Sequence, residues 1–170
     1  FPDVLFENCS SGGGRFDPGM LYYMPQTWCS DDSDAVERVY IQYGASMVYP
    51  VSTIGAHVSA CPNHQVGRTT PFQMRGGVAM SGQFGYELDL TKITEEEALL
   101  VANQIEFYKQ HRDTILTGDM YRIVSPFDNP YAAWQFVSKD SNTAMLCTFV
   151  LSGKPGVAPK CFRLQGLEKD

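Results

Sequence analysis

Asp31, Asp32 and Asp34 lie within four residues of one another in the segment WCSDDSD. Crowded carboxylates oppose one another's ionisation, which suits a group that must hold a proton near neutral pH. Asp is also a preferred residue at the start of a helix, where its side chain accepts hydrogen bonds from backbone amides. The spacing favours capping for most of the cluster and leaves one carboxylate for acid–base chemistry. Trp28 is either a core residue or an apolar wall for a bound sugar.

A glycine bend, NCSSGGGR, occupies residues 8–15. It is either a flexible loop or a place where the backbone lies close against a ligand, since glycine has no side chain to prevent the approach. The bend lacks the GxxxxGK pattern of a phosphate-binding loop and the GxGxxG pattern of a dinucleotide site. Cys9 at its start is either a buried structural thiol or a nucleophile.

Composition excludes several classes of protein. A net charge of −6 argues against a nucleic-acid partner, and no apolar run is long enough for a membrane span. The five cysteines are odd in number and form no CxxC pair, and the three histidines form no HExxH pair. We therefore expect reduced thiols in a cytoplasmic protein, with no metal and no cofactor.

Hydrophobic periodicity predicts a β/α series over the first two thirds of the chain. The expected strands lie in residues 2–9, 20–29, 50–62 and 84–90, and the expected helices in residues 33–49, 69–82 and 94–116. The second strand is expected to follow an irregular approach. Asp34 with Glu37, and Thr94 with Glu97, have the spacing of helix capping boxes. Such a series predicts a parallel sheet with helical crossovers, and it contains about half the units of a closed eight-stranded barrel.

The pattern changes after Gly118. The segments MYRIVSPF, AAWQFVSKD, TAMLCTFVLSG and KCFRLQGL alternate or run apolar with turns between them, which predicts four antiparallel strands. We therefore assign an α/β fold, with residues 1–117 as one domain. Residues 118–170 are expected to form all or part of a small antiparallel β domain.

The glycine bend and the acidic cluster are expected to lie at one edge of the parallel sheet. The first strand ends at NCSSGGGR and the second at WCSDDSD. Ligands of β/α folds bind at the C-terminal ends of the strands, so the two motifs are expected to share a site.

Three long segments resemble the α-galactosidases of glycoside hydrolase family 36: FENCSSGGGRFDPGMLYYMPQTWCSDDSDAVER, YPVSTIGAHVSACPNHQVGR and FGYELDL. The resemblance covers about residues 1–125. It implies the C-terminal half of a catalytic (β/α)8 TIM barrel followed by a β domain. It also implies a retaining enzyme that removes terminal α-galactose from oligosaccharides such as melibiose and raffinose.

The resemblance also assigns roles to single residues. Asp31 matches the general acid/base, which leaves Asp32 and Asp34 to capping. Cys9, Ser11 and Gly12 match residues that line the galactose site, with Trp28 close by.

A retaining enzyme needs a second carboxylate, and in this family it is an Asp in a K-W-D type motif on an earlier strand. This sequence contains no such motif. We therefore expect the full-length protein to be the enzyme, a homo-oligomer, and the chain alone to be inactive. The alternatives are a galactosyl transferase of the same clan and a non-catalytic carbohydrate-binding fragment. In a half-barrel, the apolar faces of VLF and FGYELDL are expected to line the barrel interior.

Overall fold

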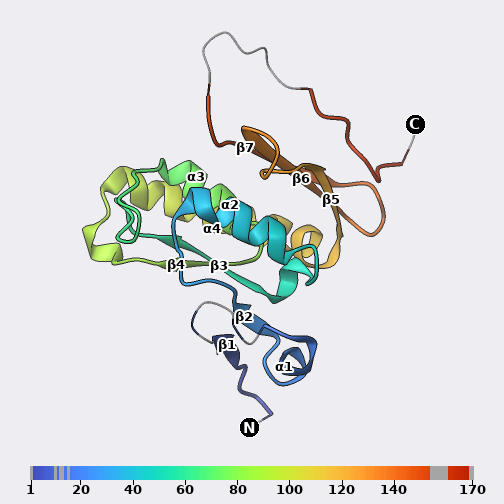
Figure 1. Cartoon of the computed structure of the whole chain (residues 1–170), viewed down its shortest axis with the longest axis horizontal. Coiled ribbons are helices and arrows are strands. Elements are labelled where there is room, and N and C mark those ends of the chain that lie inside the picture. Colours follow the sequence, from blue (N-terminus) through green and yellow to red (C-terminus); the bar gives the residue numbers. More distant parts are fainter. Residues whose placement is uncertain (1, 10, 12–13, 15, 154–160, 169–170) are drawn as a thin grey trace. The chain divides into compact units, whose positions relative to one another are not determined.

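The computed structural model describes the chain except residues 1, 10, 12–13, 15, 154–160 and 169–170. The chain folds into two compact units, residues 1–110 and residues 111–170. The first unit contains a parallel sheet and the second an antiparallel sheet (Figure 1). The α/β class and the separate antiparallel sheet are therefore confirmed, and the domain boundary at residues 117/118 stays a prediction.

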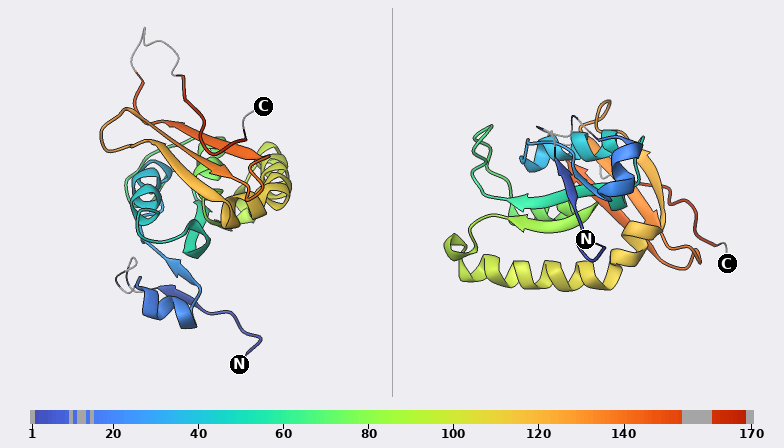
Figure 2. Two further views of the ribbon diagram at one scale, coloured as in Figure 1. Left: turned by 90° about the vertical axis from the view of Figure 1, so that its right-hand side faces the viewer. Right: turned by 90° about the horizontal axis from the view of Figure 1, so that it is seen from below.

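The sheet of the first unit has four strands in the order β1-β2-β3-β4, and all neighbouring strands are parallel. The strands are β1 (Glu7–Cys9), β2 (Gln26–Trp28), β3 (Ile54–Ser59) and β4 (Gln83–Glu87). The helices are α1 (Pro18–Tyr23), α2 (Ala35–Ala45), α3 (Phe72–Ala79) and α4 (Glu95–Thr117), and short 3-10 turns occupy Val51–Thr53 and Leu90–Lys92. Because each crossover between neighbouring strands contains a helix, the predicted β/α series is confirmed (Figure 2).

Local capping defines where two of the predicted helices begin. The Asp34 side chain accepts hydrogen bonds from the amides of Val36 and Glu37 at the start of α2. Thr94 and Glu97 form the predicted reciprocal pair at the start of α4, because the Thr94 hydroxyl accepts from the Glu97 amide and the Glu97 carboxylate from the Thr94 amide. At α2 the Glu37 carboxylate instead contacts Arg68.

Helix α1 corrects the prediction of an irregular approach to the second strand. Asp17 caps this helix by accepting a hydrogen bond from the Met20 amide, and Pro18 occupies the first turn. Pro is well suited to that position, since its fixed backbone angle is helical and its missing N–H would have no partner there.

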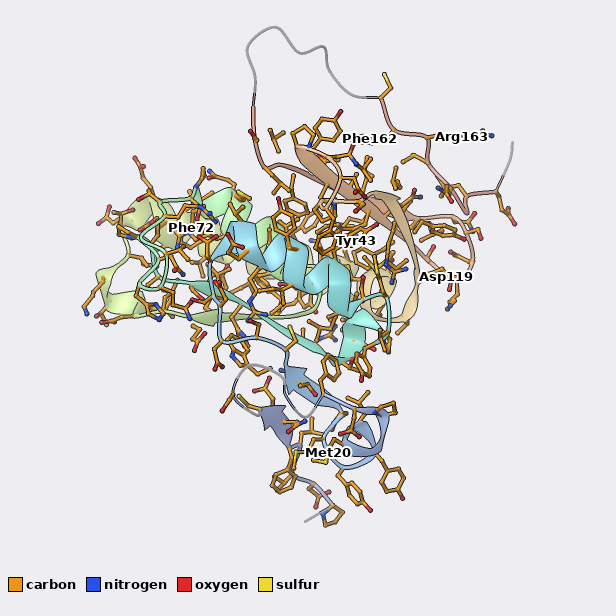
Figure 3. The ribbon with its side chains drawn as sticks, in the orientation of Figure 1. Met20, Tyr43, Phe72, Asp119, Phe162 and Arg163 are labelled. Carbon is orange, nitrogen blue, oxygen red and sulfur yellow. The ribbon has the colours of Figure 1, made fainter. Side chains whose placement is uncertain are left out.

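The apolar side chains of β3 and β4 pack against helices. Val58 forms a cluster with Phe72 and Ala79 of α3, against which Phe84 and Tyr86 of β4 also pack. Figure 3 labels Phe72 at the start of α3 and the buried Tyr43 on α2.

Since side chains alternate across a strand, the opposite face of the sheet receives the intervening residues. These are Gly55, His57 and Ser59 on β3, which align with Gln83, Gly85 and Glu87 on β4. The prediction that FGYELDL would line an interior with its apolar residues is therefore wrong, because its aromatic residues lie on the helix-covered face.

The prediction of a buried first strand is also wrong. Val4, Leu5 and Phe6 are 50%, 88% and 48% exposed. Strand β1 is short, and only Asn8 within it is buried. Residues 4–6 precede the part of β1 that pairs with β2, so no neighbouring strand among the described residues covers them.

The second unit is a three-stranded antiparallel sheet in the order β5-β6-β7. Its strands are β5 (Asp119–Val124), β6 (Tyr131–Val137) and β7 (Ala144–Val150), and Trp134 and Phe136 of the central strand are fully buried. The predicted fourth strand, KCFRLQGL, is absent from the described residues 161–168. The backbone of Gln165 bonds there to the buried side chain of Gln135, so a side-chain amide takes the place of a strand ladder.

The capping pair before α4 makes a testable contribution to stability. Thr94→Ala removes the hydroxyl that accepts from the Glu97 amide, and we expect it to lower the free energy of unfolding by about 1 kcal/mol. Urea unfolding followed by circular dichroism measures the change. Thr94→Ser keeps the acceptor and is the matched control, so equal midpoints for the two variants would contradict the capping role.

Candidate functional site

The glycine bend and the acidic segment, residues 28–34, leave the sheet at the same edge, as predicted. Cys9, the last residue of β1, aligns with Trp28, the last residue of β2. Ser59 and Glu87 are likewise aligned at the ends of β3 and β4. The C-terminal ends of the four parallel strands therefore gather the side chains of four separate loops, the usual place for a ligand site in such a sheet.

A cavity of about 350 Å³ opens over this edge. It is lined by Trp28, Asp31, Ser33, Ser59, Ala60, His64, Gln65 and Glu87. One indole ring, two carboxylates, an imidazole and two hydroxyls converge on the space. A mixture of one aromatic surface with several polar groups fits a small ligand that is rich in hydroxyl groups.

The three clustered aspartates have different surroundings. Asp34 is buried, caps α2 and pairs with Arg68. The Asp32 carboxylate accepts a hydrogen bond from the Asp34 amide, which shapes the turn before the helix. Asp31 is exposed, and among the described residues none donates a hydrogen bond to its carboxyl group. Of the three, Asp31 alone is therefore available to a ligand in the cavity.

Trp28 is half-buried and has charged and aromatic neighbours. The His57 ring lies 4.5 Å from its ring, centroid to centroid, and the Arg38 guanidinium carbon lies 4.5 Å from its centroid. The buried Arg38 also donates to the Cys29 sulfur and to the Ser30 carbonyl, both at 3.1 Å. The indole is therefore packed in place and also lines the cavity. That it forms a wall for a bound sugar stays a prediction.

Cys29 is a neutral thiol in this environment. Burial raises the pKa of Cys29, although the nearby Arg38 guanidinium acts in the opposite direction. A thiol that ionises only at high pH is a poor nucleophile. Cys29 therefore serves as a hydrogen-bond acceptor for Arg38, not as a reactive group.

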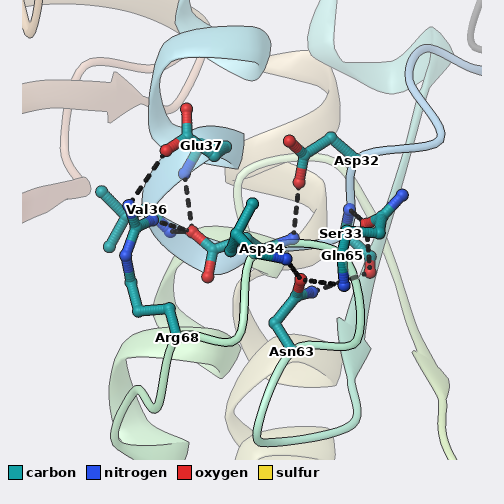
Figure 4. A network of polar contacts seen from close by, with 9 residues as sticks. Asp32, Ser33, Asp34, Val36, Glu37, Asn63, Gln65 and Arg68 are labelled. Carbon is teal, nitrogen blue, oxygen red and sulfur yellow. Dashed lines mark hydrogen bonds and ion pairs between the residues drawn. The ribbon is translucent and has the colours of Figure 1, made fainter.

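A loop after β3 holds the acidic segment from its other side (Figure 4). Arg68 contacts Asp34 and donates to the Glu37 carboxylate at 3.1 Å. Asn63 donates to the Ser33 hydroxyl at 3.1 Å, and Gln65 contacts both Asp31 and Ser33. Contacts between residues about thirty positions apart thus fix the segment that bears Asp31.

The glycine bend is described only in part. Cys9 is exposed, so the interpretation as a buried structural thiol is wrong. Ser11 is exposed and has a backbone φ of 47°, in the left-handed region that glycine adopts without strain. Neither residue is among those that line the cavity. Gly12, the third residue assigned to the bend's ligand contact, lies outside the described residues, as does Arg15.

The described residues contain no group of three or more His, Cys, Asp or Glu side chains arranged to hold a metal ion. All five cysteines are free thiols. No helix in the described part of the chain is long and apolar enough to cross a membrane.

Sequence reasoning missed six of the eight residues that line the cavity: Ser33, Ser59, Ala60, His64, Gln65 and Glu87. Ser59 and Glu87 end strands, so the rule that ligands bind at strand C-termini could have identified them. No local signal marks His64 or Gln65, because residues 60–64, ACPNH, show only the pattern typical of the end of a strand, and Gln65 follows them. Their place in the site depends on how the loop folds back across the sheet edge.

Comparison with known proteins relates the chain to one enzyme family. The melibiase family model matches residues 1–118. The whole chain is 55% identical to α-galactosidase AgaA of Geobacillus stearothermophilus and covers 23% of that protein. It is 49% identical to the bifunctional α-galactosidase/sucrose kinase AgaSK of Mediterraneibacter gnavus, of which it covers 18%. The chain thus spans less than a quarter of the length of these relatives.

Solved structures agree with this relationship. A crystal structure of a variant of AgaA in complex with raffinose matches 99% of the chain with a TM-score of 0.97 and 55% identity, and 23% of that chain is covered. The α-galactosidase from Lactobacillus brevis matches 99% of the chain with a TM-score of 0.96 and 49% identity, again over 23% of its own length. The described fold is therefore the fold of the corresponding part of these enzymes.

His57 beneath the site gives a pH-dependent prediction. Burial lowers the pKa of His57, and Glu7 and Glu87 offset this only in part. The unfolded chain therefore takes up a proton at this residue before the folded chain does, so stability falls as pH drops through about 6.5. We expect His57→Gln to flatten the dependence of the thermal midpoint on pH between about 5 and 7.

Calorimetric scans across that pH range test this expectation. His64→Gln, which removes an exposed histidine from the same unit, is the matched control for the loss of an imidazole. An unchanged pH profile for His57→Gln would contradict the idea that burial holds this imidazole neutral.

Proposed function

The chain belongs to the melibiase family, and from this premise we propose that it is part of an α-galactosidase that hydrolyses terminal α-galactosyl residues of oligosaccharides. The relatives that match over its whole length are α-galactosidases. One matching structure is a complex with raffinose and another a complex with stachyose. The proposed substrates are accordingly oligosaccharides of the melibiose and raffinose type.

In this proposal Asp31 is the general acid/base of a retaining mechanism. Its carboxyl group protonates the leaving glycosidic oxygen, and the resulting carboxylate then activates the water that releases galactose. The observation that supports the assignment is the contrast within the acidic cluster. Asp32 and Asp34 are engaged with backbone amides, whereas Asp31 lines the cavity and no described residue donates a hydrogen bond to its carboxyl group.

The remaining assignments concern the sugar. Trp28 lines the cavity beside Asp31 and provides an apolar surface for a pyranose. We propose that the glycine bend contacts the galactosyl group through Cys9, Ser11 and Gly12. The alignment of Cys9 with Trp28 supports this, because it brings the start of the bend next to the indole at one sheet edge.

The chain supplies only part of the proposed catalytic site. A retaining glycosidase needs a nucleophilic carboxylate about 5–5.5 Å from the acid/base. We propose that the nucleophile lies outside residues 1–170, on the other half of a (β/α)8 TIM barrel of which residues 1–117 form the C-terminal half. The family model ends at residue 118, directly after α4, which supports a boundary between this half-barrel and the β domain of residues 118–170.

Two further features belong to the proposal. The free thiols support a cytoplasmic location, since reduced cysteines are usual there. The full-length protein is proposed to be a homo-oligomer.

Asp31 is tested in the full-length protein. We expect Asp31→Asn to lower kcat/KM for raffinose by about 10²–10⁴-fold, the usual contribution of general acid catalysis. A 2,4-dinitrophenyl galactoside should lose much less, because its leaving group needs no proton. Initial rates on both substrates measure the difference.

Asp32→Asn is the matched control, since asparagine keeps an oxygen that can accept from the Asp34 amide. Equal losses on the two substrates for Asp31→Asn would argue against the acid/base role. A selective loss for Asp32→Asn would move the role to that carboxylate. Detection of transferred galactose in place of free galactose would favour a transferase of the same clan.

The isolated 170-residue chain gives an independent test. A retaining enzyme cannot complete a double displacement without its nucleophile, which we propose lies outside this chain, so we expect no turnover of an aryl galactoside above the buffer rate. The full-length protein assayed at the same molar concentration is the control. Turnover by the isolated chain would place the nucleophile among its own residues and would contradict the proposed division of the site.

A further inference from the structure

The Gln65 side chain brackets the backbone around Asp31. Its Nε2 donates to the Asp31 carbonyl at 2.6 Å, and its Oε1 accepts from the Ser33 amide at 2.9 Å. The Ser33 hydroxyl contacts the same oxygen at 3.2 Å. One amide group thus binds on both sides of Asp32 and closes a ring across the acidic segment. Figure 4 shows Gln65 beside Ser33.

Gln65 is itself held by its own loop. The Asn63 side-chain oxygen accepts from the amides of Gln65 and Val66, at 2.9 and 3.0 Å. Asn63 is buried, and its Nδ2 donates to the Ser33 hydroxyl at 3.1 Å. The Asn63 amide also donates to the Arg68 carbonyl, which closes the loop on itself. The amide group of Gln65 therefore projects from an anchored turn onto the acidic segment.

Asp31 needs such external support. Its side chain is exposed, and no described residue binds its carboxyl group, so the position of its backbone limits where its rotamers can place that group. Arg38 fixes the preceding residue by donating to the Ser30 carbonyl at 3.1 Å. Gln65 is the side chain that binds the backbone of Asp31 itself.

We propose that Gln65 is a positioning residue for the acid/base, which fixes the backbone of Asp31 so that its carboxyl group points at the leaving-group oxygen. This inference rests on the proposed function and adds a residue to it. Gln65 acts through Asp31 and takes no proton. Its effect should therefore appear only in reactions that need protonation of the leaving group.

The size of the effect follows from geometry. Displacing a catalytic group by about 1 Å can cost up to about 10²-fold in rate. Because Arg38 and the Ser33–Asn63 contact still hold the segment, we expect Gln65→Ala to lose about 10-fold in kcat/KM for raffinose. The value for a 2,4-dinitrophenyl galactoside should change by less than about twofold, with KM nearly unchanged for both substrates.

The experiment compares three variants of the full-length protein on these two substrates. Gln65→Ala removes both contacts, and Gln65→Glu keeps the size and the acceptor for Ser33 but replaces the donor to the Asp31 carbonyl. Gln83→Ala is the matched control. It also removes a glutamine that donates to a backbone carbonyl, that of Ser52 at 2.9 Å, but at the N-terminal end of β4, away from the cavity. Thermal midpoints of all variants separate catalytic effects from misfolding.

A loss on raffinose for both Gln65 variants, with the dinitrophenyl galactoside spared and Gln83→Ala unaffected, is the expected result. Equal losses on both substrates would overturn the positioning role in favour of a general structural one. A rise in KM with kcat unchanged would instead make Gln65 a substrate contact. If the unsubstituted protein turned over neither galactoside, the proposed function would fail first and the inference with it. Normal turnover that the Gln65 substitutions leave unchanged would contradict this inference but not the proposed function.

Discussion

The buried carboxylate of Asp34 is the constraint on which the acidic segment depends. It accepts the exposed amides at the start of α2 and pairs with Arg68 from the loop after β3. A buried charge is tolerated only with such partners, because its desolvation would otherwise be costly. Asp34 therefore fixes the direction of the helix and the place of the loop at the same time. The residues between Trp28 and Asp34 connect the fixed end of β2 to the fixed start of α2. Asp31 lies in this short connection and lines the cavity.

The neighbouring contacts all stabilise the segment between Trp28 and Asp34. Arg38 reaches back from α2 to the Ser30 carbonyl and lies over Trp28, while Gln65 and Asn63 reach in from the opposite loop. The three hydrogen bonds among these contacts pair side-chain groups with the backbone or a hydroxyl of an irregular segment, which has no strand ladder of its own. The backbone that bears the exposed Asp31 carboxylate is thus held in place, as expected where a proton must be delivered in a defined direction.

The two faces of the parallel sheet differ in polarity, since one has apolar side chains and the other mostly polar ones. The face toward the helices contains Val58, Phe84 and Tyr86, whereas the other contains His57, Gln83 and Glu87. Parallel sheets usually bury apolar residues on both faces. A polar second face is therefore unusual, and it is consistent with a sheet whose C-terminal edge opens into a site for a hydroxyl-rich ligand.

The sequence by itself determined the features that depend on residues within about four positions of one another. The caps at Asp34 and at Thr94 with Glu97, and the alternation of the parallel strands with helices α2, α3 and α4, follow from local spacing. The motifs at the ends of the first two strands follow from it too, whereas helix α1 was not predicted. The tertiary structure alone decided which side chains surround Asp31. Gln65 meets Asp31 across 34 positions and Ser33 across 32. Contacts at that separation exist only after the parallel strands align, because alignment brings loops that are distant in the chain to one edge.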